Sequence, residues 1–385
     1  MTEREAALAL VGARGVGPRT AEALRSRYGS YAAALARGVG DARVPEAVRR
    51  SLAVRTPRVL ARELRVLERE GIAFVELGAP AYPGLLEEIH GPPPGLFMEG
   101  APPGTELHVA VVGARRAAER SLVIARALGR GLAARGVSVV SGLARGVDSA
   151  AHRGALSAGG RTVAVLGSGL RRIYPPENAG LAREIVDSGC VVSEFPPRLD
   201  ARPSHFPRRN RVVAGLSAAV VVVEASDRSG ALITAALALD EGREVLACPG
   251  PAGEAAFRGS NRLIRDGARL VESAEDVLED LEGAWGPFLG AVAETAPRPR
   301  PELSERAVSV LGALSLEAVS PDEAAAAVAA PIEVVLSALV ELELAGVARR
   351  VAGGRYVVSD EESARRRRTG DREEPRSRGA RGGGR

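Results

Sequence analysis

The sequence contains no lysine, so all 52 of its lysine-or-arginine residues are arginines. This absence excludes a Walker A phosphate-binding loop and any chemistry that proceeds through a Schiff base, because both need a lysine amine. We interpret the missing lysine as the result of a GC-rich genome, and we draw no conclusion from it beyond these exclusions.

Cysteine and histidine are also scarce, with two cysteines and four histidines in 385 residues. Cys190 and Cys248 lie in apolar, strand-like runs, and we interpret them as small core residues and not as a disulfide or metal pair. The histidines are scattered and form neither an HExxH motif nor a cluster with cysteine. No loop combines GxGxxG with the acidic partner of a dinucleotide site. We therefore expect no metal and no cofactor.

Long apolar segments are absent as well. No apolar run reaches the roughly 18 residues of a membrane-spanning helix without a charge or a proline. The N-terminus lacks the apolar core of a signal peptide. We expect a cytoplasmic protein with no membrane association.

The net charge of +4 comes from the C-terminal end of the chain. Residues 361–385 contain nine arginines and five acidic residues, so residues 1–360 are neutral overall. A high isoelectric point is therefore no argument for nucleic-acid binding. Any such argument must rest on local clusters of charge.

The sequence pattern changes along the chain and predicts six segments. They are a helical domain over 1–75, a Pro/Gly-rich connector over 76–107, a Rossmann-like domain over 108–285, a linker over 286–302, a winged-helix-like domain over 303–358 and a disordered Arg/Gly-rich tail over 359–385. In the first domain, the turn Gly15-Val-Gly-Pro18 between two apolar-periodic segments is typical of a helix-hairpin-helix, as in SAM-like domains. Such a hairpin either contacts DNA phosphates or serves as a packing unit, and both interpretations stay open.

The winged-helix-like domain is predicted from its order of three helices followed by two short strands. Its third helix, over 331–344, carries Glu333, Glu341 and Glu343 and no arginine. A helix with that charge fits a phosphate-lined major groove poorly. We therefore expect this domain to bind a partner or to pack within the chain.

The central domain alternates apolar, strand-like segments with helical ones. Strands are expected over 108–113, 137–141, 162–166, 191–194, 218–224 and 244–247. Strands that are apolar throughout, with crossover helices between them, predict an α/β fold: a Rossmann-like, doubly wound, mostly parallel sheet covered on both faces. Ligands of such a sheet bind beyond the C-terminal ends of its strands.

Small and polar residues follow these predicted strands. Glycines that open helices present backbone N–H groups to an anion, and Arg115 and Arg145 add positive charge above the same edge. The further candidates from these loops are Ser141, Gly142, Gly146, Gly167, Ser168, Gly169, Ser229 and Gly230. A tight turn explains any one glycine better, but several that converge on one edge predict a phosphate-binding crevice.

Asp148 and His152 share one face of a predicted helix, because they lie four residues apart. We favour a helix N-cap and a packed histidine over a catalytic pair. No catalytic residue is predicted.

The segment 204–217 is the most informative part of the chain. It combines an aromatic ring expected to be exposed with arginines and an asparagine, namely Phe206, Arg208, Arg209, Asn210 and Arg211. No carboxylate occurs between Asp200 and Glu224, so we expect no local partner for this positive charge. A ring that stacks on a base, beside guanidinium groups that hold phosphates, is what binding of single-stranded nucleic acid requires. The alternative is a solvated basic loop.

Several motifs then occur together, in one order, over residues 108–270. They are SGLARGVDSAAHRGAL at 141–156, TVAVLGSGL at 162–170 with Tyr174-Pro175 and Asn178, HFPRRNR at 205–211, SGALITA at 229–235 and GSNRLIRDGA at 259–268. With these motifs the chain resembles the DNA-processing protein A family (DprA, also called Smf). The predicted flanking domains agree with the architecture of that family.

The resemblance implies a homodimeric, non-enzymatic protein that binds single-stranded DNA and loads a RecA-type recombinase onto it during natural transformation. It places Arg115, residues 141–146, residues 167–169 and residues 206–211 in the DNA groove. One departure is Ala118-Glu-Arg-Ser121, where the family usually has a Ser-Pro-Tyr-Gly-like run. We leave residues 118–121 out of the predicted site.

Two other functions compete with this one. Nucleoside-monophosphate phosphoribohydrolases of the lysine decarboxylase-like type share the Rossmann core and use a Gly-Gly-x-Gly-Thr-x-x-Glu loop. The comparable loop here, 229–236, has no carboxylate after Thr234, so the usual general acid/base is missing. A scaffold that binds only protein is compatible with the acidic third helix, but the segment 206–211 argues against it.

Overall fold

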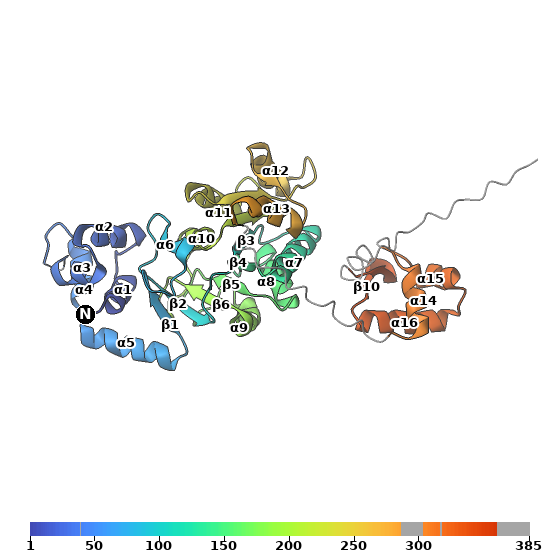
Figure 1. Cartoon of the computed structure of the whole chain (residues 1–385), viewed down its shortest axis with the longest axis horizontal. Coiled ribbons are helices and arrows are strands. Elements are labelled where there is room, and N and C mark those ends of the chain that lie inside the picture. Colours follow the sequence, from blue (N-terminus) through green and yellow to red (C-terminus); the bar gives the residue numbers. More distant parts are fainter. Residues whose placement is uncertain (39, 286–302, 316–317, 360–385) are drawn as a thin grey trace, which may run out of the picture. The chain divides into compact units, whose positions relative to one another are not determined.

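The computed structural model describes residues 1–38, 40–285, 303–315 and 318–359 (Figure 1). The contacts divide the chain into two compact units, Met1–Ala293 and Glu294–Arg385. The predicted linker over 286–302 lies outside the described residues, as does the predicted tail except for Ser359.

The first unit begins with five helices. They are α1 (Glu3–Val11), α2 (Pro18–Tyr28), α3 (Tyr31–Gly38), α4 (Glu46–Ala53) and α5 (Pro57–Arg69). Helix α1 starts at a capping box, in which the Thr2 side chain accepts from the backbone of Glu5 while the Glu5 side chain accepts from the backbone of Thr2. The predicted turn at 15–18 joins α1 to α2, and Gly15 has a φ of +79° there.

A nine-stranded sheet forms the centre of this unit. Its strands are β1 (Ala73–Glu76), β2 (Gly95–Gly100), β3 (His108–Val112), β4 (Ser138–Ser141), β5 (Thr162–Val165), β6 (Cys190–Ser193), β7 (Ala219–Val222), β8 (Glu244–Ala247) and β9 (Arg269–Leu270), in the order β1-β2-β6-β5-β4-β3-β7-β8-β9. Strands β3 to β9 pair in parallel, whereas β1–β2 and β2–β6 are antiparallel. The doubly wound, mostly parallel sheet is therefore confirmed, and all six predicted strands are present.

Three strands were not predicted, namely β1, β2 and β9. Strand β2 falls within the segment interpreted as a connector, 76–107, which also contains the short helix α6 (Gly84–Glu87). Phe97 of β2 lies opposite Ser193 of β6, so this segment extends the sheet. The segment 76–107 is thus part of the central sheet and not only a connector that packs against it.

Helices cover both faces of the sheet (Figure 1). They are α7 (Glu119–Ala134), α8 (Val147–Ser157), α9 (Ala179–Ser188), α10 (His205–Leu216), α11 (Gly230–Asp240), α12 (Arg258–Arg265) and α13 (Ala274–Trp285), with the short 3-10 helices η1 (Pro176–Asn178) and η2 (Ala255–Phe257). Val109 and Val111 of β3 pack in the cluster that holds α7, α8 and α13. Ala110 and Val112 pack in the cluster that holds α9, α10 and α11 and continues into the N-terminal helices. This alternation is the two-residue period of a strand.

The route of the chain places one helix over the centre of the sheet edge. From β3 the chain moves outward through β4 and β5 to β6, and α10 then carries it back to β7, which pairs with β3. The first turn of α10 is thereby brought to the C-terminal ends of the middle strands. That edge is where a doubly wound sheet binds its ligands.

The second unit is a winged helix, as predicted. It consists of α14 (Glu305–Ala313), α15 (Pro321–Val328), α16 (Ile332–Leu344), β10 (Ala348–Val351), the 3-10 helix η4 (Ala352–Gly354) and β11 (Arg355–Val358). Val310, Val335 and Leu339 are among the residues of its core. On α16, Glu333 and Glu343 are exposed, so the acidic character of this helix is a surface property.

Within the described ranges, no single helix is long and apolar enough to cross a membrane. Helices α15 and α16 reach that length and composition only as a bent pair, and both contribute apolar side chains to the core of the second unit.

Candidate nucleic-acid interface

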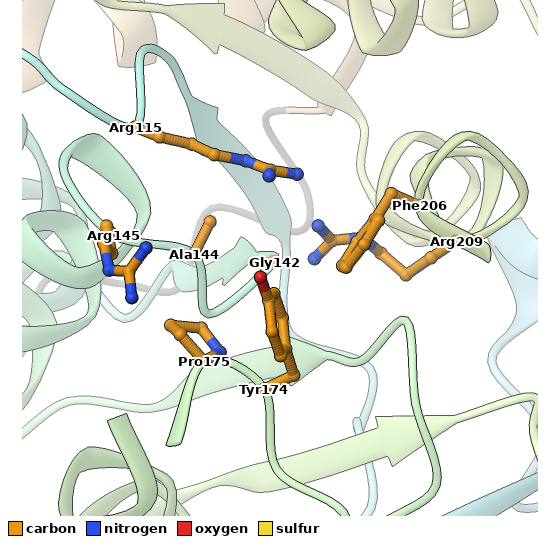
Figure 2. Close-up of a pocket in the computed structure, with 8 residues that line it drawn as sticks. All are labelled: Arg115, Gly142, Ala144, Arg145, Tyr174, Pro175, Phe206 and Arg209. Atoms are coloured by element: carbon orange, nitrogen blue, oxygen red, sulfur yellow. The ribbon is translucent and has the colours of Figure 1, made fainter. Parts of the chain in front are cut away.

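A pocket lies at the C-terminal edge of the sheet (Figure 2). Its lining comes from the loops after β3, β4 and β5 and from the first turns of α10: Arg115, Gly142, Ala144, Arg145, Tyr174, Pro175, Phe206 and Arg209. Of the predicted candidates, the structure brings Arg115, Gly142, Arg145, Phe206 and Arg209 together here. Phe206 and Arg209 join the residues of the loops because α10 crosses back over this edge of the sheet.

The aromatic wall of the pocket contains two rings. The ring centres of Phe206 and Tyr174 are 5.6 Å apart, with the planes tilted by 48°. The guanidinium carbon of Arg115 lies 5.0 Å from the centre of the Phe206 ring, in cation–π contact. Gly167 leaves room for this ring, because a Cβ atom there would lie 2.9 Å from Phe206. Phe206 is half-buried, so the expected exposure is only partial.

Tyr174 was missed as a site residue although its side chain is 44% exposed. Its position in the loop that follows the third predicted strand, within a motif of the resembling family, was the available signal. A second ring enlarges the surface on which a planar group can stack.

The loop between β4 and α8 is held by a buried acid. The Oδ2 atom of Asp148 accepts hydrogen bonds from the backbone N–H groups of Gly142, at 3.1 Å, and Ala144, at 3.2 Å. Burial raises the pKa of Asp148, and the nearby Arg209 guanidinium opposes that rise. Asp148 is therefore an anchor for the loop and not the predicted helix N-cap, a position that Gly146 occupies.

Arg209 is also buried beneath the pocket, at 5% exposure. Its Nη1 donates to the carbonyl oxygen of Val165 at 2.7 Å. Gly142 must be a glycine for this arrangement, because a Cβ atom there would lie 1.6 Å from Nη1. Burial lowers the pKa of Arg209, while Asp148 raises it. Arg209 and Asp148 are therefore two buried groups of opposite charge under the loop, and each shifts the pKa of the other.

These contacts correct one expectation about the glycine loops. The N–H of Gly142 is taken by Asp148, and the N–H of Gly169 donates to the carbonyl oxygen of Leu199 at 2.8 Å. The expectation that these two N–H groups are free for an anion is wrong. An anion in this pocket must be held mainly by guanidinium groups.

The same loop has an unusual but well-supported backbone. Leu143 is buried and has a φ of +57°, a conformation that a residue with a branched side chain adopts only when its surroundings impose it. The Nδ2 of Asn178 donates to the carbonyl oxygen of Leu143 at 2.8 Å and to Oγ of Ser149 at 2.9 Å. Gly146, at a φ of +76°, approaches so close to Ala114 that a Cβ atom would lie 2.2 Å from its carbonyl oxygen. The pocket floor is thus preformed.

Arg208 and Arg211, both predicted to contact DNA, do not line the pocket. Both form ion pairs with Glu194, which follows β6 and is 2% exposed. The Nε of Arg208 lies 2.9 Å from Oε1 of Glu194, and Arg211 also donates to the carbonyl oxygen of Gly91 at 2.7 Å. The expectation of an unpartnered cluster is wrong, because the partner comes from a neighbouring strand end and not from the same segment.

The remaining predicted candidates also lie outside the pocket lining. Ser141 and Ser168 are buried, and the Ser141 hydroxyl donates to the carbonyl oxygen of Val111 at 2.7 Å. The Nδ2 of Asn210 donates to the carbonyl oxygen of Gly230 at 3.4 Å. Ser229 is the N-cap of α11, with its hydroxyl accepting from the backbone of Ala231 at 3.3 Å. These contacts hold the loops and helices around the pocket.

His152 is packed in the interior, as favoured from the sequence. Its Nδ1 lies 2.7 Å from Oγ1 of Thr162, and burial lowers its pKa to about 3. It is therefore neutral at physiological pH. Across the described part of the chain, no three His, Cys, Asp or Glu side chains are grouped to hold a metal ion.

Two arginines give the pocket its exposed positive charge. Arg115 is exposed and makes no ion pair with any described residue. Arg145 is exposed and forms an ion pair with Glu177 of η1. The site therefore offers two aromatic rings beside two accessible guanidinium groups.

Comparison with known proteins gives consistent matches. Residues 73–282 match the family model described as DNA recombination-mediator protein A, and residues 294–354 match the DprA winged helix domain. Protein Smf of Escherichia coli K12 is 39% identical over 303 residues, which cover 75% of this chain and 78% of that protein.

Solved structures of DNA processing protein A are among those that resemble the chain. DNA processing protein A from Streptococcus pneumoniae superposes with a TM-score of 0.65 at 33% identity, over 73% of this chain and 98% of that one. DNA processing protein A from Helicobacter pylori, described for its single-stranded DNA binding mode, has a TM-score of 0.50 at 28% identity, over 55% of this chain and 96% of that one.

Proposed function

Because the chain belongs to the DNA recombination-mediator protein A family, we propose that its pocket binds single-stranded DNA and that the protein delivers the strand to a RecA-type recombinase during DNA uptake and natural transformation. It acts by binding and not by catalysis, as a homodimer in the cytoplasm. The recombinase and the dimer rest on the family resemblance, whereas the DNA site rests on the pocket itself.

The observation that carries the proposal is the combination of rings and guanidinium groups in one pocket. A base stacks against Phe206 and Tyr174, and the flanking phosphates lie at Arg115 and Arg145. Both contacts tolerate any sequence, because every base has a flat face and every nucleotide a phosphate. In a duplex, the faces of the bases are covered by their neighbours, so the rings have nothing to stack on.

Two features weigh against the phosphoribohydrolase alternative. Glu224, the acid that follows β7, is buried, and its Oε2 accepts from the backbone N–H of Ala118 at 2.9 Å. The N–H groups of Gly142 and Ala144, which would cradle a nucleotide phosphate, are occupied by Asp148. Release of free base from nucleoside monophosphates, abolished by Glu224→Gln, would support the enzyme instead.

We expect the protein to bind a single-stranded oligonucleotide much more tightly than a duplex of equal length. If Arg115 and Arg145 each neutralise one phosphate, the slope of log Kobs against log salt is at its steepest about −1.4, from about −0.7 per phosphate for single strands. Fluorescence anisotropy titrations over a salt series measure both quantities. Equal affinity for the duplex, or a slope near zero, would exclude this site.

Arg115 and Arg211 are expected to respond differently to the same substitution. Arg115→Gln weakens single-strand binding and makes the salt slope shallower by about 0.7, because one phosphate contact is lost. Arg211→Gln leaves the slope unchanged but lowers the melting temperature, because Glu194 is then buried with one cationic partner fewer. A shallower salt slope for Arg211→Gln would show that Arg211 contacts a DNA phosphate.

A further inference from the structure

One arginine of the pocket already has a carboxylate as its partner. Glu177 pairs with Arg145, and Arg145 lines the pocket. The pairing lowers the pKa of Glu177, so the carboxylate is ionised at neutral pH. A phosphate that binds the guanidinium of Arg145 therefore meets a group of the same charge, which already occupies the Nε donor.

The position of Glu177 is fixed by its neighbours. Asn178 is buried, and its hydrogen bonds to Leu143 and Ser149 attach η1 to the same loop that carries Arg145. Pro175, on the other side of Glu177, lines the pocket. The backbones that carry the two charges are thus held together before any ligand arrives.

We propose that Glu177 is an internal competitor for the DNA phosphate at Arg145, which lowers the affinity of the pocket and speeds release of the strand. This inference rests on the proposed function. Arg115, in contrast, lies over the Phe206 ring and forms no ion pair with a carboxylate in the described part of the chain. The two arginines therefore contribute differently to DNA binding: the phosphate contact of Arg115 is uncontested, and the phosphate contact of Arg145 is weakened by Glu177.

The competition is weak enough to be overcome. The side chains of Arg145 and Glu177 are 60% and 46% exposed, and ion pairs of that exposure are only slightly favourable. Displacement also leaves Glu177 to attract a cation, which offsets part of the counterion release at Arg145. The wild-type salt slope is then shallower than the number of phosphate contacts alone predicts.

The test compares Glu177→Gln with a matched control, Glu254→Gln. Glu254 pairs with Arg120 outside the pocket, and these side chains are 45% and 48% exposed. For a fluorescent oligo-dT at low salt, we expect Glu177→Gln to bind about two- to five-fold more tightly, the range of an exposed ion pair. Dissociation slows by a similar factor, the salt slope steepens, and Glu254→Gln behaves as wild type. Melting temperatures confirm that both variants are folded.

A second background separates competition from general repulsion. In Arg145→Gln protein, the additional change Glu177→Gln should bring no gain in affinity, because the contested guanidinium is gone. An unchanged affinity of the single variant, or a gain that persists without Arg145, overturns the competitor role. Failure of the wild-type protein to bind oligo-dT at all would instead overturn the proposed function.

Discussion

Replacing Arg209 with methionine should lower the free energy of unfolding by about 3–5 kcal/mol, the usual cost of removing one partner from a buried pair of charges. The variant leaves the carboxylate of Asp148 in the interior without its cation. It also removes the donor to the carbonyl oxygen of Val165 and empties the space above Gly142. Urea unfolding at neutral pH measures the loss.

The pH dependence of this variant has a definite sign. Burial already holds the pKa of Asp148 above its ordinary value, and loss of Arg209 raises it further. A group whose pKa is raised in the folded state stabilises the fold most when protonated, so the deficit against wild type grows as pH rises through that pKa. The double variant Asp148→Asn/Arg209→Met should lose less stability than the sum of the single changes. Additive losses would show that the two side chains do not act as a pair.

Replacing Phe206 with alanine should weaken single-strand binding by about 1–3 kcal/mol, the usual contribution of one base stacked on an aromatic ring. Because the ring is half-buried, the loss of stability should stay below the roughly 3–5 kcal/mol of a fully buried phenylalanine. Affinity and unfolding are measured on the same preparation.

Phe195 provides the control for this prediction. It is 2% exposed and stacks on His205 with ring centres 4.4 Å apart, but it does not line the pocket. Phe195→Ala should therefore reduce stability more than Phe206→Ala and reduce the affinity of the folded protein less. A Phe206→Ala protein that is strongly destabilised yet binds DNA normally would mean that the ring is only a structural plug.

The sheet was predictable where strands are apolar on both faces, as in Val109–Val112, because burial on two sides leaves an uninterrupted apolar run. Strand β2 was not predicted because it lies in a Pro/Gly-rich segment, and strand β9 was not predicted because it has only two residues. Such strands become ordered by pairing with a neighbouring strand, and the local sequence pattern does not show that pairing.

The candidate site was also predictable only in part. Residue type and position after a strand were enough to select Arg115, Arg145 and Phe206, which share the pocket. The partners of charged side chains were not predictable, since Glu194 reaches Arg208 and Arg211 only through the pairing order of the strands. A stretch of sequence without carboxylates is therefore poor grounds for free positive charge.

The return of the chain through α10 also sets the order in which the site comes into being during synthesis. The loops with Arg115, Gly142, Arg145 and Tyr174 all precede residue 206, so the ribosome releases the charged walls before Phe206 and Arg209. Strand β7, which follows α10, must then pair with β3, made about a hundred residues earlier. Until that pairing forms, a nascent chain carries Arg115, Arg145 and Tyr174 without Phe206 and Arg209 fixed beside them. The complete pocket lining is thus assembled late, after most of the sheet has left the ribosome.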